Sequence, residues 1–277
     1  MLYAYLTGKE SQDTIVRGFA KGAGAQILPI QHYLKGGIPP KASGVIFAGM
    51  LRGNMLLYND VMAKGVDYYY IDHAYFKSGY DHPAWMRVTR NGFAQNNIIT
   101  NDQTRWNTYF QKPMMPYNFE DKSKILVLPT SPAVKRTFGV DNWLDKVIRT
   151  LTRHTNRQIV VREKGGPVLD STGTKTIEWQ KFHHPQTIDE MWNDLYCVVT
   201  FNSSVGIQAL QKGIPTICTK FCPAWPLSNK LENIENLLKF NRTPLFASLS
   251  WGQYTLDEME SGEAIRYVNK FNQIVKT

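Results

Sequence analysis

The sequence predicts an α/β protein with two domains, each built on a mostly parallel sheet. Short apolar runs of strand type alternate with helical patterns along most of the chain, and this alternation is typical of parallel βαβ units. The alternation stops between residues 73 and 118, where aromatics, asparagines and prolines gather, and then starts again. We therefore expect two Rossmann-like domains, residues 1–118 and 119–277, with a cleft between them and a last helix that can pack back on the first domain.

Local sequence places the elements of the first domain. Its strands are predicted at residues 2–6, 26–30, 44–47 and 66–71. A helix is expected from Ser11, a good N-cap residue, because apolar residues then recur at helical spacing. A second helix is predicted at 54–64, with Gly65 to end it.

The second domain shows the same pattern. Its strands are predicted at residues 124–129, 158–162, 197–201 and 216–218. Its helices are predicted at residues 142–152, 188–195, 204–212 and 255–275. Ligands of such folds bind at the carboxyl edge of the parallel strands, so residues just after each strand are the candidates for a site.

Composition excludes several classes of protein. With 43 % hydrophobic and 12 % aromatic residues among 277, the chain can build a full core, which excludes intrinsic disorder and a disulfide-stapled mini-fold. Three cysteines, an odd number, suit reduced thiols. The sequence has neither a secretory leader nor an apolar run of the roughly 18 residues that a membrane helix needs. We expect a cytoplasmic protein.

Charge points to a class of partner. The 32 Lys plus Arg against 23 Asp plus Glu give a net charge of +9, which favours a polyanion such as nucleic acid, nucleotides or an anionic membrane surface. Metal sites have little support, because the adjacent His183 and His184 would point to opposite faces of a strand. No Walker A, HExxH or DxD-like motif stands in a credible context. We expect no bound metal.

The sharpest local signal is the segment 198–215, in which an apolar strand runs into Asn202-Ser-Ser and a helix, and Gly-Ile-Pro leads to the next strand. Unpaired N–H groups and the helix dipole make such a helix start an anion site, to which Ser203 and Ser204 add hydroxyls. The alternative is that either serine is only an N-cap. The immediate return of the chain into the sheet favours the functional interpretation.

Two further strand ends carry groups suited to a diphosphate. Arg162 and Lys164 follow one strand beside a Gly-Gly turn, and Thr130 and Ser131 follow another. Arginine can bind phosphate in bidentate fashion and lysine as a point charge; the alternative is a solvated turn. With the serines, these residues form a candidate nucleotide-binding site.

The first domain offers candidates for catalysis. Arg52 stands between turn glycines after a strand, and we expect it to face the same cleft and to help bind the donor. Asp72 and His73 end the strand that begins at residue 66, where a carboxylate or imidazole is a natural general base for an acceptor hydroxyl. The alternative for Asp72 is a helix cap or a hydrogen-bonded core carboxylate.

The aromatic stretch between the domains interleaves rings with cations. It contains Arg87, Arg90, Arg105 and Trp106, and such a mixture suits phosphate contacts together with stacking on bases or sugars. The alternative is a surface loop anchored by buried aromatics.

Six segments carry a resemblance to known proteins. They are Gly44-Val-Ile-Phe-Ala-Gly-Met-Leu-Arg-Gly, Tyr70-Ile-Asp-His-Ala-Tyr-Phe, Arg87-Val-Thr-Arg-Asn-Gly, Val160-Val-Arg-Glu-Lys, Thr200-Phe-Asn-Ser-Ser-Val-Gly-Ile-Gln-Ala-Leu and Trp251-Gly-Gln-Tyr-Thr-Leu-Asp-Glu-Met-Glu-Ser-Gly. Through them, residues 44–265 resemble a group of bacteriophage proteins that is similar to GT-B glycosyltransferases of the capsular-polysaccharide type.

The resemblance implies a GT-B fold and a metal-independent glycosyltransferase. A sugar nucleotide, expected to be a UDP-sugar, would be the co-substrate of the second domain, and no other cofactor is expected. The acceptor that the resemblance suggests is phage DNA with a hydroxy- or hydroxymethyl-pyrimidine, modified in the host cytoplasm. For a duplex acceptor the target base must leave the base stack. Residues 85–112 are the segment expected to bind the DNA and hold the base outside the stack.

The resemblance also implies roles for individual residues of this chain. Ser203, Ser204, Arg162 and Lys164 would meet the diphosphate. The residues Asp72 and His73 are alternative bases.

Other functions stay open at this point. The acceptor could instead be a polysaccharide or a lipid-linked glycan. A sugar-nucleotide epimerase would bind the same donor without a macromolecular acceptor. A non-catalytic DNA-binding protein would keep the basic charge and bind no donor.

Overall fold

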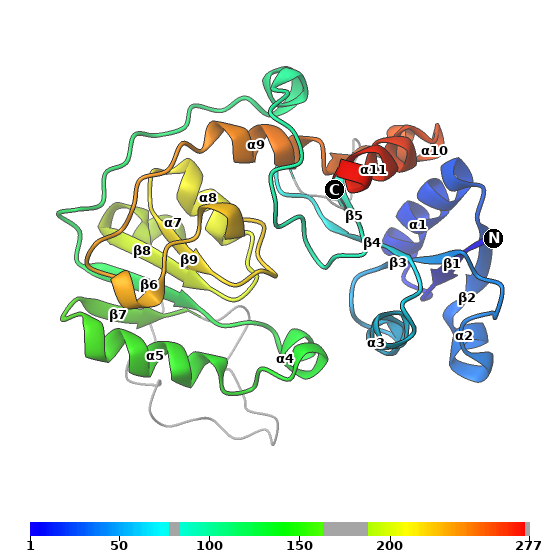
Figure 1. Ribbon diagram of the computed structural model, residues 1–277, viewed down its shortest axis with the longest axis horizontal. Coiled ribbons are helices and arrows are strands. Elements are labelled where there is room, and N and C mark those ends of the chain that lie inside the picture. Colours follow the sequence, from blue (N-terminus) through cyan, green and yellow to red (C-terminus); the bar gives the residue numbers. More distant parts are fainter. Residues whose placement is uncertain (78–83, 163–187, 275–277) are drawn as a thin grey trace. The chain divides into compact units, whose positions relative to one another are not determined.

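Two separate sheets organise the chain, one in each of two units (Figure 1). The structure is a computed structural model that describes residues 1–77, 84–162 and 188–274. The first unit consists of Met1–Gln111 and Phe246–Thr277, and the second of Lys112–Leu245. The first unit thus ends seven residues before the expected boundary at 118, and the whole segment from Phe246, rather than the last helix alone, belongs to it. The predicted class, α/β with two mostly parallel sheets, is confirmed, and two such units are what a GT-B fold consists of.

The sheet of the first unit has six strands in the order β10-β5-β4-β3-β1-β2. Its four parallel strands are β1 (Leu2–Leu6), β2 (Gln26–Pro29), β3 (Gly44–Ala48) and β4 (Tyr68–His73). Two antiparallel strands complete it, β5 (Met86–Arg90) and β10 (Gln253–Tyr254). Sequence analysis did not predict these last two strands.

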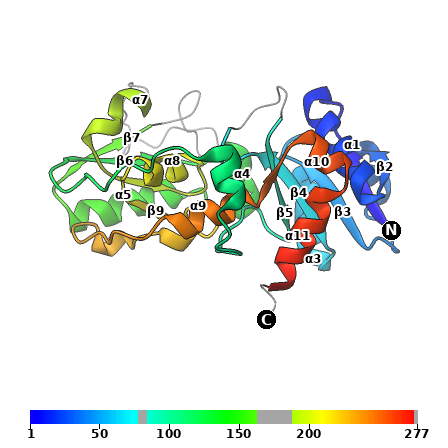
Figure 2. The same ribbon diagram turned by 90° about the horizontal axis from the view of Figure 1, so that it is seen from above.

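Helices cover both faces of this sheet (Figure 1). One face carries α1 (Glu10–Ala23), α10 (Leu256–Glu260) and α11 (Glu263–Ile274). Figure 2 shows α10 and α11 running over the strands from above. The other face carries α2 (Ile30–Gly36) and α3 (Asn54–Lys64).

The packing follows the alternation of side chains along each strand. Ala4, Tyr69 and Val88 face α1, α10 and α11 and join one apolar cluster with Phe19. Residues of the opposite parity face the other way, so that Tyr5 meets Tyr33 of α2 with ring centroids 5.9 Å apart. The single helix expected at 255–275 is divided at residues 261–262 into α10, which begins with a capping box at Thr255, and α11.

The sheet of the second unit has four parallel strands in the order β7-β6-β8-β9. They are β6 (Lys124–Leu128), β7 (Gln158–Val161), β8 (Leu195–Thr200) and β9 (Thr216–Cys218). Their α-helices are α4 (Pro132–Phe138), α5 (Trp143–His154), α7 (Ile188–Met191) and α8 (Val205–Gln211). Near-continuous burial of β6 and β8 is expected of a parallel sheet that has helices on both faces.

Short helical turns and one bridging helix complete the description. They are η1 (Trp106–Phe110), η2 (Trp192–Asp194), η3 (Trp225–Leu227), η4 (Leu231–Asn233) and α9 (Thr243–Ser250). The stretch expected to be loops between residues 73 and 118 therefore contains β5 and the π-helical turn η1. Within the described ranges, no helix has the length and apolar character needed to cross a membrane.

Candidate functional site

The predicted nucleotide residues of the second unit gather at the carboxyl edge of its sheet. β6 pairs in parallel with both β7 and β8, so the three strands end at one edge. Thr130, Arg162 and Asn202 follow these strands. The Thr130 hydroxyl donates to Asn202 Oδ1 at 2.8 Å and joins the loop after β6 to the loop after β8.

The serines at this edge mark two helix starts. Ser131 is the N-cap of α4, and its Oγ accepts from the Val134 N–H at 3.4 Å. Ser203 Oγ accepts from the Val205 N–H at 3.2 Å. Ser204 is the N-cap residue of α8, exposed, with no side-chain capping bond. Capping, the alternative considered for Ser203 and Ser204, thus describes the side chain of Ser203, while Ser204 is exposed without a capping bond.

The predicted donor-binding cations divide into three cases. Arg162 is half-buried directly after β7, and its backbone N–H donates to the Val127 carbonyl at 3.1 Å. Lys164 lies outside the described residues. Arg52 lies in the first unit, exposed in the turn between β3 and α3 with a left-handed φ of 57°. It is therefore not one of the groups that the second sheet brings together.

A residue that sequence analysis missed, Lys135 of α4, lies in the same region. It is only 5 % exposed, whereas lysine is almost never this buried without a partner. Among the described residues its ammonium group has no ion-pair partner, and its nitrogen is not one of the buried side-chain atoms that lack a hydrogen bond, so the ammonium group itself keeps contact with solvent. Side chains of a helix tilt toward its N-terminus, and the N-cap of α4 is Ser131, four residues before Lys135.

A lysine whose stem is buried while its ammonium group stays accessible can bind an anionic ligand as a fixed point charge. The edge also carries Arg162 and the exposed Ser204 hydroxyl at the start of α8. Cations, hydroxyls and backbone N–H groups together are the donors that phosphate oxygens accept from.

In the first unit, Asp72 stands at the end of β4 and is held by three donors. Its Oδ2 accepts from the Tyr70 hydroxyl at 2.7 Å and from Arg87 Nη2 at 2.9 Å. Its Oδ1 accepts from the backbone N–H of His73 at 2.8 Å. Burial alone would raise the pKa of the Asp72 carboxyl, but Arg87 and these hydrogen bonds outweigh it and hold the pKa below its usual value. A carboxylate so stabilised is a weak general base.

His73, the alternative base, is exposed at the same strand end. Its backbone N–H supports Asp72, while its imidazole lies on the opposite face of β4 from that carboxylate. Imidazole is the side chain that most often exchanges a proton near neutral pH. His73 is thus the more exposed of the two candidate bases at this strand end.

Of the four predicted DNA contacts, Arg87, Arg105 and Trp106 are buried in the first unit, while Arg90 is half-buried. Arg87 is 7 % exposed, and its guanidinium lies within 5.8 Å of the ring centroids of Tyr70, Tyr75 and Phe93. Arg90 belongs to the other face of β5, where it pairs with Asp67. Arg87 and Arg90 therefore cannot form one phosphate-binding surface.

Arg105 and Trp106 are buried as well. Arg105 is 5 % exposed and makes a bidentate ion pair with Glu258, with bonds of 2.6 and 2.7 Å. Its remaining donors reach the carbonyls of Ser250 and Gln253, both at 2.8 Å. Trp106 is 4 % exposed among other aromatic rings. The alternative of buried aromatic anchors describes this stretch, because its cations are used to attach the C-terminal segment.

No cluster of three metal-ligating side chains occurs among the residues that the structure describes. The pair His183 and His184 lies outside them. The three cysteines are buried as free thiols, and burial raises the pKa of Cys197 well above its usual value. All three thiols lack the exposure of a reactive nucleophile.

Comparison with known proteins yields structural similarities alone. No known family profile matches the sequence, and no curated protein matches it significantly. The chain is similar to the beta Kdo 2,4 transferase of KpsC from Thermosulfurimonas dismutans, with 11 % identity, a TM-score of 0.49, and coverage of 88 % of this chain and 89 % of that one. It is also similar to the beta Kdo 2,7 transferase of the same KpsC, with 13 % identity, a TM-score of 0.49, and coverage of 97 % and 99 %.

Proposed function

We propose that this protein is a glycosyltransferase that uses a nucleoside-diphosphate sugar, expected to be a UDP-sugar. The observation that carries the proposal is Lys135, whose stem is buried and whose ammonium group has no anionic partner among the described residues, on the helix that follows strand β6. Arg162 and Ser204 lie at the same edge. An anionic ligand of high charge density, such as a diphosphate, would be bound by these groups.

The proposed reaction follows from these groups. The oxygen of an acceptor hydroxyl forms a bond to the anomeric carbon, the bond from that carbon to the phosphate oxygen breaks, and the nucleoside diphosphate leaves. The cations and N–H groups of the second unit would stabilise the negative charge that develops on the leaving group. The hydroxyl proton would pass to His73, with Asp72 as the alternative base.

For the acceptor we propose a hydroxy- or hydroxymethyl-pyrimidine in phage DNA. The net charge of +9 supports a polyanionic acceptor, and the resemblance to phage proteins supports DNA. A polysaccharide or lipid-linked glycan is the alternative acceptor. The buried cations Arg87 and Arg105 do not help to decide between DNA and a glycan as acceptor.

Substitution of Lys135 tests the donor site. Lys135→Met keeps the length and apolar stem of the side chain and removes its charge. We expect the wild-type protein to gain about 2.7 kcal/mol of stability at a UDP concentration 100 times its Kd. The variant should bind UDP at least tenfold more weakly in calorimetric titration. Lys146→Met, an exposed lysine on α5 of the same unit, is the control and should bind as the wild type does.

A further variant, at His73, separates donor binding from sugar transfer. His73→Gln should keep UDP binding and lose transfer of sugar from UDP-sugars to hydroxymethylated duplex DNA, measured by mass spectrometry of the nucleosides. Unchanged UDP binding by Lys135→Met would overturn the donor site. Transfer to a glycan but never to DNA would overturn the proposed acceptor while leaving the donor site intact.

A further inference from the structure

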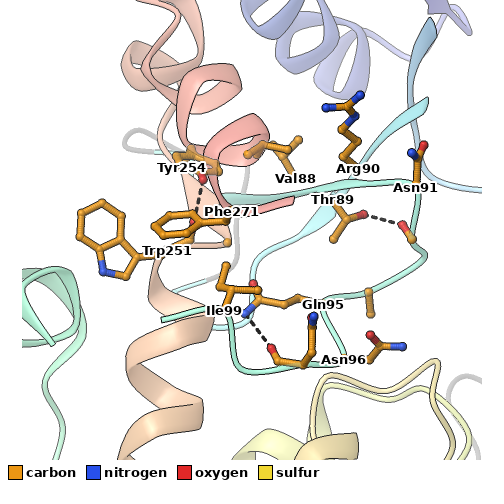
Figure 3. A pocket seen from close by; sticks show the side chains of 15 residues that line it. Val88, Thr89, Arg90, Asn91, Gln95, Asn96, Ile99, Trp251, Tyr254 and Phe271 are labelled. Carbon is orange, nitrogen blue, oxygen red and sulfur yellow. Dashed lines mark hydrogen bonds between the residues drawn. The ribbon is translucent and has the colours of Figure 1, made fainter. Parts of the chain in front are cut away.

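A pocket of about 160 Å³, partly open to solvent, lies in the first unit (Figure 3). It is bounded by the end of β5, the loop that follows it, residues 251–254 and α11. Because β5 runs antiparallel to β4, its last residue, Arg90, is at the edge of the sheet where the parallel strands begin. The pocket and His73 therefore occupy opposite edges of one sheet.

Most of the pocket wall is apolar and aromatic. The wall residues of this kind are Val88, Ile99, Trp251, Tyr254, Val268 and Phe271. The Trp251 indole is fixed, since its Nε1 donates to the Asp102 carbonyl at 3.0 Å. The charged residue of the wall, Arg90, is neutralised by its ion pair with Asp67. Such a wall favours a ligand that is uncharged and has a flat apolar face.

One polar group of the wall has a fixed orientation. Gln95 is 8 % exposed, and its Nε2 donates to Ser248 Oγ at 2.7 Å and to the Asn97 carbonyl at 3.3 Å. Because a carbonyl can only accept, the amide nitrogen must face Asn97, and this fixes the place of Oε1. The hydrogen bonds of the Gln95 side chain to described residues are both made by Nε2. Oε1 is not one of the buried atoms without a partner, so Gln95 offers an accessible acceptor in the wall of the pocket.

Gly252 makes room for this acceptor. A Cβ at Gly252 would lie 2.2 Å from Gln95 Oε1 and 3.3 Å from a Tyr75 ring carbon. Gly252 also lines the pocket. The side-chain amide of Asn97, half-buried in the same wall, supplies a second polar group.

Size and polarity together define the ligand. A protein cavity of about 150 Å³ holds one benzene ring, so the volume of about 160 Å³ suits a single six-membered ring. A pyranose carries a hydroxyl on most of its carbons and would bury several against Val88, Val268 and Phe271 without partners, at a cost in free energy. A pyrimidine has two apolar faces and a few polar atoms on its edge, among them an N–H that can donate to Gln95 Oε1.

We infer that this pocket binds a single pyrimidine base. The base belongs either to a free nucleoside or to a nucleic-acid strand from which it has left the stack. The inference does not depend on the donor site, which lies in the other unit.

The experiment follows the Trp251 indole N–H of the full chain by NMR, with the resonance assigned from a Trp251→Phe variant. Thymidine, cytidine, adenosine, methyl glucoside and a dT oligonucleotide are titrated separately. We expect both pyrimidine nucleosides to shift the resonance saturably, adenosine to bind at least tenfold more weakly, and methyl glucoside to leave it unchanged. An oligonucleotide that binds more tightly than thymidine identifies a strand as the source of the base, and one that does not identifies a free nucleoside.

Two variants keep the test independent of folding and of the donor site. Gln95→Met removes the acceptor, and Asn97→Ala removes the second amide but keeps the carbonyl that holds Gln95. Each should weaken thymidine binding at least tenfold. Lys135→Met should leave it unchanged, while Gln95→Met should leave UDP binding unchanged. No shift with either pyrimidine, a shift with methyl glucoside, or wild-type binding by both variants would overturn the inference.

Discussion

The pair of Asp72 and Arg87 shows how a buried charge is retained inside the first unit. Its N–O distance is 2.9 Å, and the arginine and aspartate side chains are 8 % and 25 % exposed. Three aromatic rings surround the guanidinium. Removing one member of such a pair leaves the other as an uncompensated charge, which costs about 3–5 kcal/mol. The pair therefore determines the stability of this sheet edge as well as the protonation of Asp72.

Stability at this residue should depend on pH. The pKa of Asp72 is lower in the folded state than its usual value, so its contribution is present above the unfolded pKa of about 3.9 and is lost as pH falls through the folded pKa. We expect Asp72→Asn to lower the free energy of unfolding by about 3–5 kcal/mol at neutral pH, and by progressively less below about pH 4. Urea unfolding between pH 7 and 3 measures this difference.

The control for this prediction is Asp121→Asn, a carboxylate whose side chain is 73 % exposed beside Lys122. It should change the free energy of unfolding by less than about 1 kcal/mol at any pH. A deficit of Asp72→Asn that stays constant from pH 7 to pH 3 would contradict the role given to the ionised carboxylate.

Single residues were the part of the site that the sequence could define least. Thr130, Arg162 and Asn202 reach one edge because the ends of parallel strands always meet there, and this was predictable. The place of Lys135 was not predictable, because the sequence alone does not distinguish a lysine with a buried stem from one that is fully exposed. The burial of Arg87 and Arg105 was missed for the same reason. Cations interleaved with aromatic residues occur on binding surfaces and also inside cores, and the sequence does not tell the two apart.

At the scale of elements, the sequence predicted what is local and missed what depends on distant pairing. The parallel strands and α1, α3, α5 and α8 were expected near their observed positions. β10 has two residues and exists because it pairs with β5, about 165 residues earlier in the chain. No local pattern could indicate such a strand.

The close approach of α1 to the turn between α10 and α11 gives a prediction at this scale. A Cβ at Gly22 would lie 2.0 Å from the Met259 carbonyl oxygen and 2.6 Å from the Gly262 nitrogen, both of them backbone atoms that cannot rotate away. We expect Gly22→Ala to lower the free energy of unfolding by about 1–3 kcal/mol, measured by urea denaturation. Gly36→Ala is the matched control, because that helical glycine has open space around its Cβ position. It should be neutral or raise stability by up to about 1 kcal/mol. Equal effects at both glycines would argue against this contact.

At the scale of the whole molecule, the chain passes from the first unit into the second and returns. The returning segment supplies Tyr254, Met259, Ala264 and Val268 to the apolar cluster of the first unit. It also supplies the partners of Arg105. The sequence indicated two halves but placed this segment, apart from its last helix, in the second one, because the α/β alternation continues without a visible break.

Truncation after Leu245 distinguishes the two divisions of the chain. It removes β10, α10 and α11, and with them one face of the core in the first unit, while the four-stranded sheet of the second unit keeps all its strands. We expect amides of β1, β3, β4 and β5 to lose hydrogen-exchange protection by at least tenfold and those of β6 and β8 to keep theirs, as measured by mass spectrometry against the full chain. If residues 119–277 formed one domain, the loss would fall on β6 and β8 instead. The location of the loss therefore reports directly which sheet the C-terminal segment stabilises.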